Sequence, residues 1–283
     1  MKWQRDHKSD DVIDRRGVST QTAKIAAGGG GLVALILALI FGPDALQGTG
    51  LAPPTGGAVG QEVAAPPADD KDKELVAFVS FVLDDIQAFW AKELPRIGGP
   101  WQKAKLVLFT DTVASACGHQ TAATGPFYCP GDQYAYIDLG FYRVLKERLG
   151  APGDFAQAYV LAHEIGHHIQ NLRGTSTEVH LAQQRDPANA NALSVRLELQ
   201  ADCYAGVWAH STARRELLER GDLEESLRAA SSIGDDTLQK QAGGAVRPES
   251  WTHGSSAQRL AWFKRGFESG RAEACDTFAP GSP

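Results

Sequence analysis

Residues 25–43 read IAAGGGGLVALILALIFGP and contain no charged side chain, which divides the chain into unequal parts. As a helix, the apolar part of this stretch is about 25 Å long, slightly less than a bilayer core of about 30 Å. Arg15, Arg16 and Lys24 precede the stretch, and the first charged residues after it are acidic. Because basic residues flank the cytoplasmic side of a membrane span, we expect residues 25–43 to form a single-pass signal anchor, with residues 1–24 in the cytoplasm.

Two other readings of this stretch stay open. It could be a buried core helix, although the Ala-, Gly- and Pro-rich segment 44–72 that follows it is typical of a flexible linker. It could also be a cleaved signal peptide, although its basic region is long and no small-residue cleavage site follows it. A twin-arginine signal at Arg15-Arg16 is disfavoured, because the pair lies too far from the apolar run.

The rest of the chain, residues 73–283, has the composition of one folded domain. Overall, 43% of the residues are hydrophobic and 22% are charged, which excludes a wholly disordered or polytopic membrane protein. The formal net charge of −6 provides no basic excess, so we expect no nucleic-acid partner.

Hydrophobic periodicity within residues 73–283 predicts an α+β fold that is mostly helical with a small sheet. Strands are expected first and most of the helices afterwards. The expected strands are 105–111 and 133–141, and the expected helices are 75–94, 155–172, 191–217, 222–233 and a last one opened by a capping box at Ser255 and Gln258.

The helix expected at 155–172 contains His163, Glu164 and His167 in an HExxH pattern. Histidines at i and i+4 project from the same face of a helix and can bind one zinc ion. Glu164 is displaced around the helix, so it can act as general base on a zinc-activated water without binding the metal. The neighbouring His168 points elsewhere, and we expect it to be solvated or hydrogen-bonded.

A catalytic zinc site also needs a third protein ligand and an open fourth position. The next long helix contains Glu198 and Asp202, which share one helical face. We expect Glu198 to be the third ligand and Asp202 to accept a hydrogen bond from a ligand histidine. The alternative is that both acids face water or pair with Arg196.

These motifs resemble the putative neutral zinc metallopeptidase family of bacteria. The resemblance rests on HEIGHHIQ (163–170) and LELQADCYAGVWA (197–209), and extends through residues 117–141, 233–239 and 251–263. It implies a zincin-like metallopeptidase fold with one catalytic Zn²⁺, a protein or peptide substrate, and an N-terminal membrane anchor. The domain would then lie outside the cytoplasm of a bacterial cell, attached to its membrane.

Peptide hydrolysis also needs a group that stabilises the developing oxyanion. We expect His253 to have this role, with Arg259 as the second candidate, because THGSSAQR is similar to a segment of the prenyl-processing membrane zinc proteases. The alternative is a structural role for both, with His253 as a hydrogen-bonding residue at the helix start and Arg259 in an ion pair. Tyr128 and Tyr136 are further possible donors.

The four cysteines suit an extracytoplasmic domain, in which disulfides persist. Cys117 and Cys129 bracket a short loop and are expected to pair, which would leave Cys203 and Cys275 as the second pair, although three pairings are possible. Zinc binding by Cys117 and Cys129 is disfavoured, because their separation fits no common zinc motif.

The sequence therefore predicts a membrane-anchored zinc metalloendopeptidase. The alternative is a zinc-stabilised extracytoplasmic binding or scaffolding module without turnover. The presence of Glu164 favours the enzyme, because a purely structural zinc has no use for a general base beside it and would be closed by a fourth Cys or His. A non-proteolytic zinc hydrolase is less compatible with HExxH on a helix.

Overall fold

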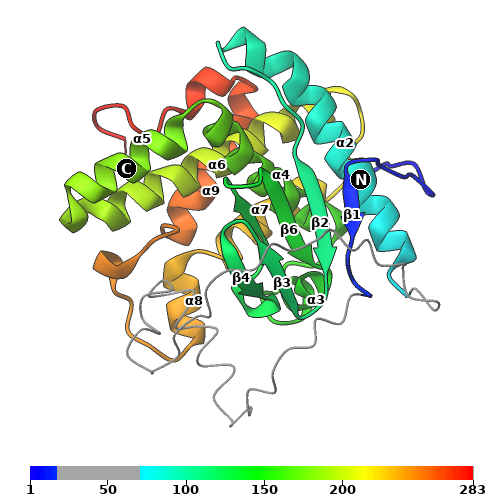
Figure 1. The fold of residues 1–283 in the computed structure, drawn as a ribbon, viewed down its shortest axis with the longest axis horizontal. Coiled ribbons are helices and arrows are strands. Elements are labelled where there is room, and N and C mark those ends of the chain that lie inside the picture. Colours follow the sequence, from blue (N-terminus) through cyan, green and yellow to red (C-terminus); the bar gives the residue numbers. More distant parts are fainter. Residues whose placement is uncertain (18–70, 283) are drawn as a thin grey trace.

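A computed structural model describes residues 1–17 and 71–282 of the chain. The described part is α+β and mostly helical, as the sequence predicts (Figure 1). The strands are β1 (Val12–Asp14), β2 (Lys105–Phe109), β3 (Thr112–Ser115), β4 (Gly118–Thr121), β5 (Phe127–Cys129) and β6 (Tyr134–Asp138). The helices are α2 (Lys73–Arg96), α3 (Gly140–Glu147), α4 (Asp154–Leu172), α5 (Thr175–Arg185), α6 (Ala190–Arg214), α7 (Asp222–Ser232), α8 (Asp235–Gln241) and α9 (Ser256–Ser269).

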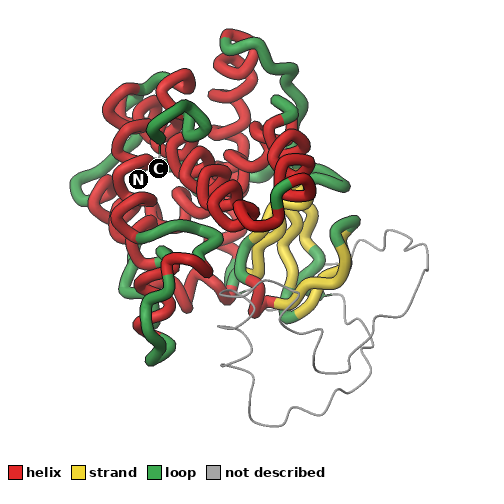
Figure 2. Tube along the Cα trace, turned by 90° about the vertical axis from the view of Figure 1, so that its left-hand side faces the viewer, coloured by secondary structure: helices red, strands yellow, loops and turns green. Residues whose placement is uncertain are grey.

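The main sheet has the strand order β1-β2-β6-β5. Strands β1, β2 and β6 are parallel, and β5 is antiparallel to β6 at the sheet edge. Strands β3 and β4 form a separate antiparallel hairpin. Figure 2 shows the strands gathered on one side of the molecule, with helices forming the rest. The core therefore lies between the main sheet and a set of helices packed around α4.

Helix α4 is buried along nearly its whole length, which is why its sequence is apolar on most faces. Helices α2, α6 and α7 pack against it. Helix α9 packs closely against α6, and two glycines make this approach possible. A Cβ atom on Gly206 would lie 2.1 Å from the carbonyl oxygen of Phe263, and one on Gly266 would lie 2.0 Å from that of Cys203.

The N-terminal residues are part of this fold. Strand β1 pairs in parallel with β2, with Val12 opposite Leu106. The Met1 side chain is buried in the main core, and its α-ammonium group lies 2.6 Å from a carboxylate oxygen of Asp154. From the charge pattern, we expect residues 1–24 to be a segment separate from the domain. The structure instead packs the described part of that segment, residues 1–17, against it.

None of the helices formed by residues 1–17 and 71–282 is long and apolar enough to cross a membrane. The expected anchor at residues 25–43 and nearly all of the expected linker at 44–72 lie outside the described residues.

Candidate metal centre and active site

Helix α4 presents His163 and His167 toward the same space. Their Nε2 atoms lie 3.2 Å apart. His163 is buried, and His167 is partly exposed. The i, i+4 spacing therefore has the geometric result that the sequence predicts, because one helical turn brings two imidazoles together.

Helix α6 brings Glu198 to the same point. One carboxylate oxygen lies 3.1 Å from Nε2 of His163, and the other lies 3.4 Å from Nε2 of His167. The two helices can approach this closely because residue 166 is glycine; a Cβ atom there would lie 2.9 Å from Cα of Ala201. The structure thus brings together all three candidate ligands, the last of which lies 31 residues after His167 in the sequence.

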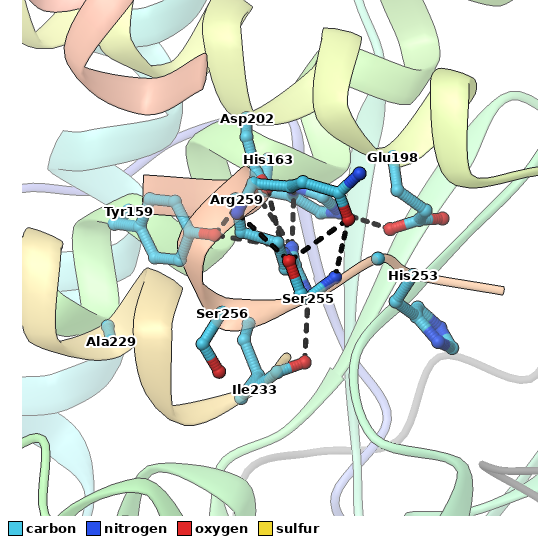
Figure 3. Close-up of polar contacts among 12 residues, drawn as sticks. Tyr159, His163, Glu198, Asp202, Ala229, Ile233, His253, Ser255, Ser256 and Arg259 are labelled. Atoms are coloured by element: carbon cyan, nitrogen blue, oxygen red, sulfur yellow. Dashed lines mark hydrogen bonds and ion pairs between the residues drawn. The ribbon is translucent and has the colours of Figure 1, made fainter. Parts of the chain in front are cut away.

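Asp202 fixes the hydrogen-bonding state of His163 (Figure 3). Its Oδ1 lies 2.8 Å from Nδ1 of His163, and it also accepts hydrogen bonds from Tyr159 and Arg259. Burial opposes ionisation of Asp202, but Arg259 and His163 outweigh it and lower its pKa to about 2. Because an ionised carboxylate only accepts hydrogen bonds, Nδ1 of His163 must donate. In the neutral imidazole, Nε2 then carries a lone pair.

The atoms that converge at this point suit a zinc ion as ligands. Nδ1 of His167 lies 2.9 Å from Oε1 of Gln170, so in its neutral form His167 also directs an Nε2 lone pair into the space. When both imidazoles are neutral, the Nε2 lone pairs of His163 and His167 therefore converge with the Glu198 carboxylate, and none of the three groups is a hydrogen-bond donor toward the others. Bonds of about 2.0–2.1 Å to a tetrahedral zinc separate its ligand atoms by about 3.3–3.4 Å, close to the observed spacings.

The pKa values of His163 and Glu198 also indicate that positive charge is favoured at this site. Burial opposes a charge on His163, but the carboxylates of Asp202 and Glu198 outweigh it and raise its pKa to about 10. Burial also opposes ionisation of Glu198, and the nearby histidines more than compensate and lower its pKa. The carboxylates of Asp202 and Glu198 therefore favour positive charge at this point, of the kind that a bound cation would supply.

Glu164 lies beside the three candidate ligands but outside their set. It is buried, and burial raises its pKa, an effect that His163 and His167 partly offset. A raised pKa suits a carboxylate that must accept and return a proton. The hydroxyl of Tyr142 is buried without a hydrogen-bond partner among the described residues, and the charge of Glu164 acts on it.

His253 lies in the loop before α9, and Figure 3 shows it on the same side as Glu198. Burial opposes its protonation, but Asp235 and the charge of Glu198 outweigh this and raise its pKa. Oδ2 of Asp235 accepts hydrogen bonds from the backbone N–H groups of Thr252, His253 and Gly254, while Oδ1 lies 3.2 Å from Nδ1 of His253. Asp235 therefore holds both the loop and the imidazole.

Arg259, the second candidate for oxyanion stabilisation, has a different environment. It is 2% exposed, and its guanidinium is bonded to Asp202, Tyr159 and the carbonyl oxygen of Ile233. These contacts match the alternative of a structural ion pair. The guanidinium is directed at Asp202 because α9 crosses α6 at that point, which the sequence alone does not show.

The two tyrosines considered as oxyanion donors are also committed elsewhere. Tyr128 is hydrogen-bonded to His168 and Asn171, and Tyr136 donates to Asp132. His168, expected to be solvated or hydrogen-bonded, is buried and bonded to Tyr128 and to the carbonyl oxygen of Gln102. Arg196, the alternative partner of Glu198 and Asp202, donates to carbonyl oxygens of the C-terminal tail.

The cysteines form the two expected disulfides, Cys117–Cys129 and Cys203–Cys275. The second ties the C-terminal tail to the helix that carries Glu198. A second group of acids, Asp154, Asp222 and Glu225, also has metal-compatible spacing. The Met1 ammonium is bound to the first two of these, so this cluster already has a cationic partner.

Three residues of the site were not found from the sequence: Tyr159, Gln170 and Asp235. Tyr159 precedes His163 by one helical turn, and Gln170 follows His167 by three residues, so helical spacing carried a signal for both. Asp235 has no such signal, because its contacts join the start of α8 to a loop 18 residues later.

Comparisons with known proteins concern the chain as a whole. The sequence model of the family described as "Putative neutral zinc metallopeptidase" matches residues 1–278. The Escherichia coli K12 protein named "Uncharacterized protein YpfJ" is 45% identical over 285 residues, which cover 98% of this chain and 99% of that protein. "Uncharacterized protein Rv2575" of Mycobacterium tuberculosis is 42% identical over 207 residues, which cover 69% of this chain and 68% of that protein. No solved structure matches the chain.

Proposed function

The chain belongs to the neutral zinc metallopeptidase family, and from that premise we propose that it is a zinc-dependent endopeptidase with Glu164 as general base. His163, His167 and Glu198 would hold the metal. The observation that carries this proposal is the convergence of three groups that can bind a metal, within 3.4 Å of one another, beside a buried carboxylate that is not one of them. We also propose the zincin fold that the resemblance implies, supported by the HExxH helix α4 and the glutamate contributed by α6.

Zinc held by three protein ligands lowers the pKa of water at its open position and polarises a carbonyl group. Glu164 would accept a proton from the attacking water and deliver it to the leaving amine. His253 would donate a hydrogen bond to the carbonyl oxygen as that oxygen gains negative charge. Asp202 would keep Nδ1 of His163 protonated and leave its Nε2 free for the metal.

We propose that the domain lies outside the cytoplasm, which its two disulfides support. Attachment to the membrane through residues 25–43 stays a prediction from the sequence. If that stretch crossed the membrane once, residues 1–17 and the domain would lie on opposite sides. Strand β1, which belongs to residues 1–17, is however hydrogen-bonded to β2 of the domain. A chain folded as described therefore keeps residues 1–17 on the same side of the membrane as the active site.

Peptide-library cleavage by the full chain, loaded with one equivalent of zinc, tests the proposal. The matched control is Glu164→Gln, which preserves the three candidate ligands and the size of the side chain. Cleavage by the parent protein, with the variant binding zinc but reduced at least about 100-fold in rate, is expected for a general base. If both proteins bind zinc and neither cleaves, the binding-module alternative is favoured. If both cleave equally, Glu164 is not the base.

A further inference from the structure

We propose that Gln170 is a positioning residue for the candidate zinc ligand His167, and that Gln200 and the disulfide-bonded C-terminal tail hold Gln170 in place. Zinc affinity should therefore depend on groups that never touch the metal. The inference rests on the zinc site of the proposed function but not on peptide hydrolysis, so the two can fail separately.

The backbone determines which way the Gln170 amide faces. Its Nε2 lies 2.7 Å from the carbonyl oxygen of Leu197 in α6. A carbonyl oxygen can only accept a hydrogen bond, so the NH₂ group must face α6 and Oε1 must face Nδ1 of His167, at 2.9 Å. Since Oε1 is also an acceptor, Nδ1 of His167 must carry the proton, and its Nε2 is free to bind a metal.

Gln200 is oriented by the same kind of argument. Its Nε2 donates to the carbonyl oxygen of Cys275 at 3.0 Å, which directs its Oε1 toward Nε2 of Gln170 at 3.2 Å. The donors therefore run in one direction, from His167 to Gln170, then to Gln200 and to the tail. Gln170 is completely buried and Gln200 is 5% exposed, so water does not readily replace these bonds.

The tail carbonyl is itself fixed. Cys275 is buried and joined by its disulfide to Cys203, three residues after Gln200 on α6. Thr277 strengthens this attachment, because its hydroxyl donates to the carbonyl oxygen of Arg196 and its own carbonyl accepts from the Arg196 side chain. The tail therefore lies in a fixed register on α6, with the Cys275 carbonyl directed at Gln200.

The two histidines are supported in different ways. His163 faces an ionised carboxylate whose charge is balanced by Arg259. His167 faces a neutral amide, which provides no charge to hold the imidazole. The orientation of His167 depends on the hydrogen-bonded side-chain amides of Gln170 and Gln200. This is why the C-terminal tail matters for His167 rather than for His163.

Zinc affinity of the full chain, measured by competition with a chromogenic chelator, tests the proposal. We expect Gln170→Leu to bind zinc about 10–100-fold more weakly, as is typical when the hydrogen-bond partner of a ligand histidine is removed. Gln200→Leu should have a smaller effect, because the Leu197 carbonyl still orients Gln170. The matched control is Gln87→Leu, which removes an equally buried, hydrogen-bonded amide in α2 and should leave zinc affinity unchanged.

The two disulfides provide a second matched pair. Replacing Cys203 and Cys275 by serine should weaken zinc binding, and this loss should not add fully to that of Gln200→Leu, since both act through the same carbonyl. Replacing Cys117 and Cys129 by serine should leave zinc affinity as in the parent. Equal losses from both disulfides would show a general effect on stability and would overturn the proposed link to the tail.

Nitrogen NMR of the zinc-free protein reads the tautomer of His167 directly. In the parent we expect the proton on Nδ1, and in Gln170→Leu we expect signal from both tautomers because nothing then holds the proton there. An unchanged tautomer with unchanged affinity would overturn the role of Gln170, even in an active peptidase. Conversely, a parent protein that binds zinc as expected and cleaves nothing would overturn the proposed function alone.

Discussion

Replacing Arg259 by methionine should cost much of the stability of this domain. The substitution keeps a long apolar side chain but leaves the carboxylate of Asp202, which is completely buried, without its bidentate partner. Removing one member of a buried ion pair typically costs about 3–5 kcal/mol. Because His163 and Tyr159 still donate hydrogen bonds to Asp202, we expect a loss near the lower end of this range. A loss of this size is a large fraction of the total stability of a typical domain.

The lowered pKa of Asp202 reflects the same interaction, together with that of His163. It is lowered from 3.8 to about 2 in the folded protein. A lowered carboxyl pKa contributes stability that is fully present above pH 4 and is lost as the pH falls through about 2; a shift of this size corresponds to about 2 kcal/mol. In Arg259→Met the native pKa should rise, so this contribution should shrink at pH 7, and Asp202 should add less to the acid-induced loss of stability than it does in the parent.

Urea unfolding of the zinc-free protein at pH 7 and at pH 4 measures both effects. The matched control is Arg271→Met, which removes an exposed arginine paired at 3.8 Å with Glu273 and should change stability by less than about 0.5 kcal/mol. The double variant with Asp202→Asn should recover part of the loss, because position 202 then no longer holds a buried carboxylate that has lost its arginine partner. A loss below 1 kcal/mol for Arg259→Met, or no recovery in the double variant, would refute the reasoning.

Three further outcomes follow from the structure. His253→Ala should lower kcat on a cleaved peptide by about 100–1,000-fold with zinc affinity unchanged, as steady-state kinetics and chelator competition would show; a change in KM alone would contradict its role on the oxyanion. Burial lowers the pKa of His168, so the stability contributed by the neutral imidazole is present above pH 6.5 and is lost as the pH falls below that value. The urea midpoints measured at pH 7.5 and at pH 5.5 should therefore differ less in His168→Gln than in the parent. Single cysteines replacing the exposed Lys8 and Lys146 should be labelled from the same side of the membrane by an impermeant thiol reagent in intact cells, whereas labelling of only one would support a single crossing between them.

Local patterns predicted the helices that carry the site. The expected helix 155–172 is α4 (Asp154–Leu172), and the capping box at Ser255 and Gln258 is present at the start of α9. Both signals depend on residues within one helical turn, so the sequence contains all that is needed. The expected end of the first helix at residue 94 is less accurate, because Pro95 lies inside the last turn of α2 and the helix continues to Arg96.

Contacts between distant segments could not be predicted in this way. Strand β1 is three residues long, too short for a periodic pattern, and its partner β2 begins more than 90 residues later. Helix α5 was missed because most of its residues are polar or exposed. The position of Arg259 likewise depends on how α9 crosses α6, so the sequence supplied the residue as a candidate but not its partner.

Close packing of α4, α6 and α9 makes three glycines as necessary for the geometry of the site as its candidate ligands are. Gly166 allows α4 and α6 to approach until Glu198 meets the two histidines, and a side chain there would collide with Ala201. Gly206 and Gly266 allow α6 and α9 to meet where Arg259 reaches Asp202. The first approach assembles the candidate metal ligands, and the second brings together the ion pair behind His163. A Cβ atom at any of the three positions would separate the helices and move a site residue without changing it.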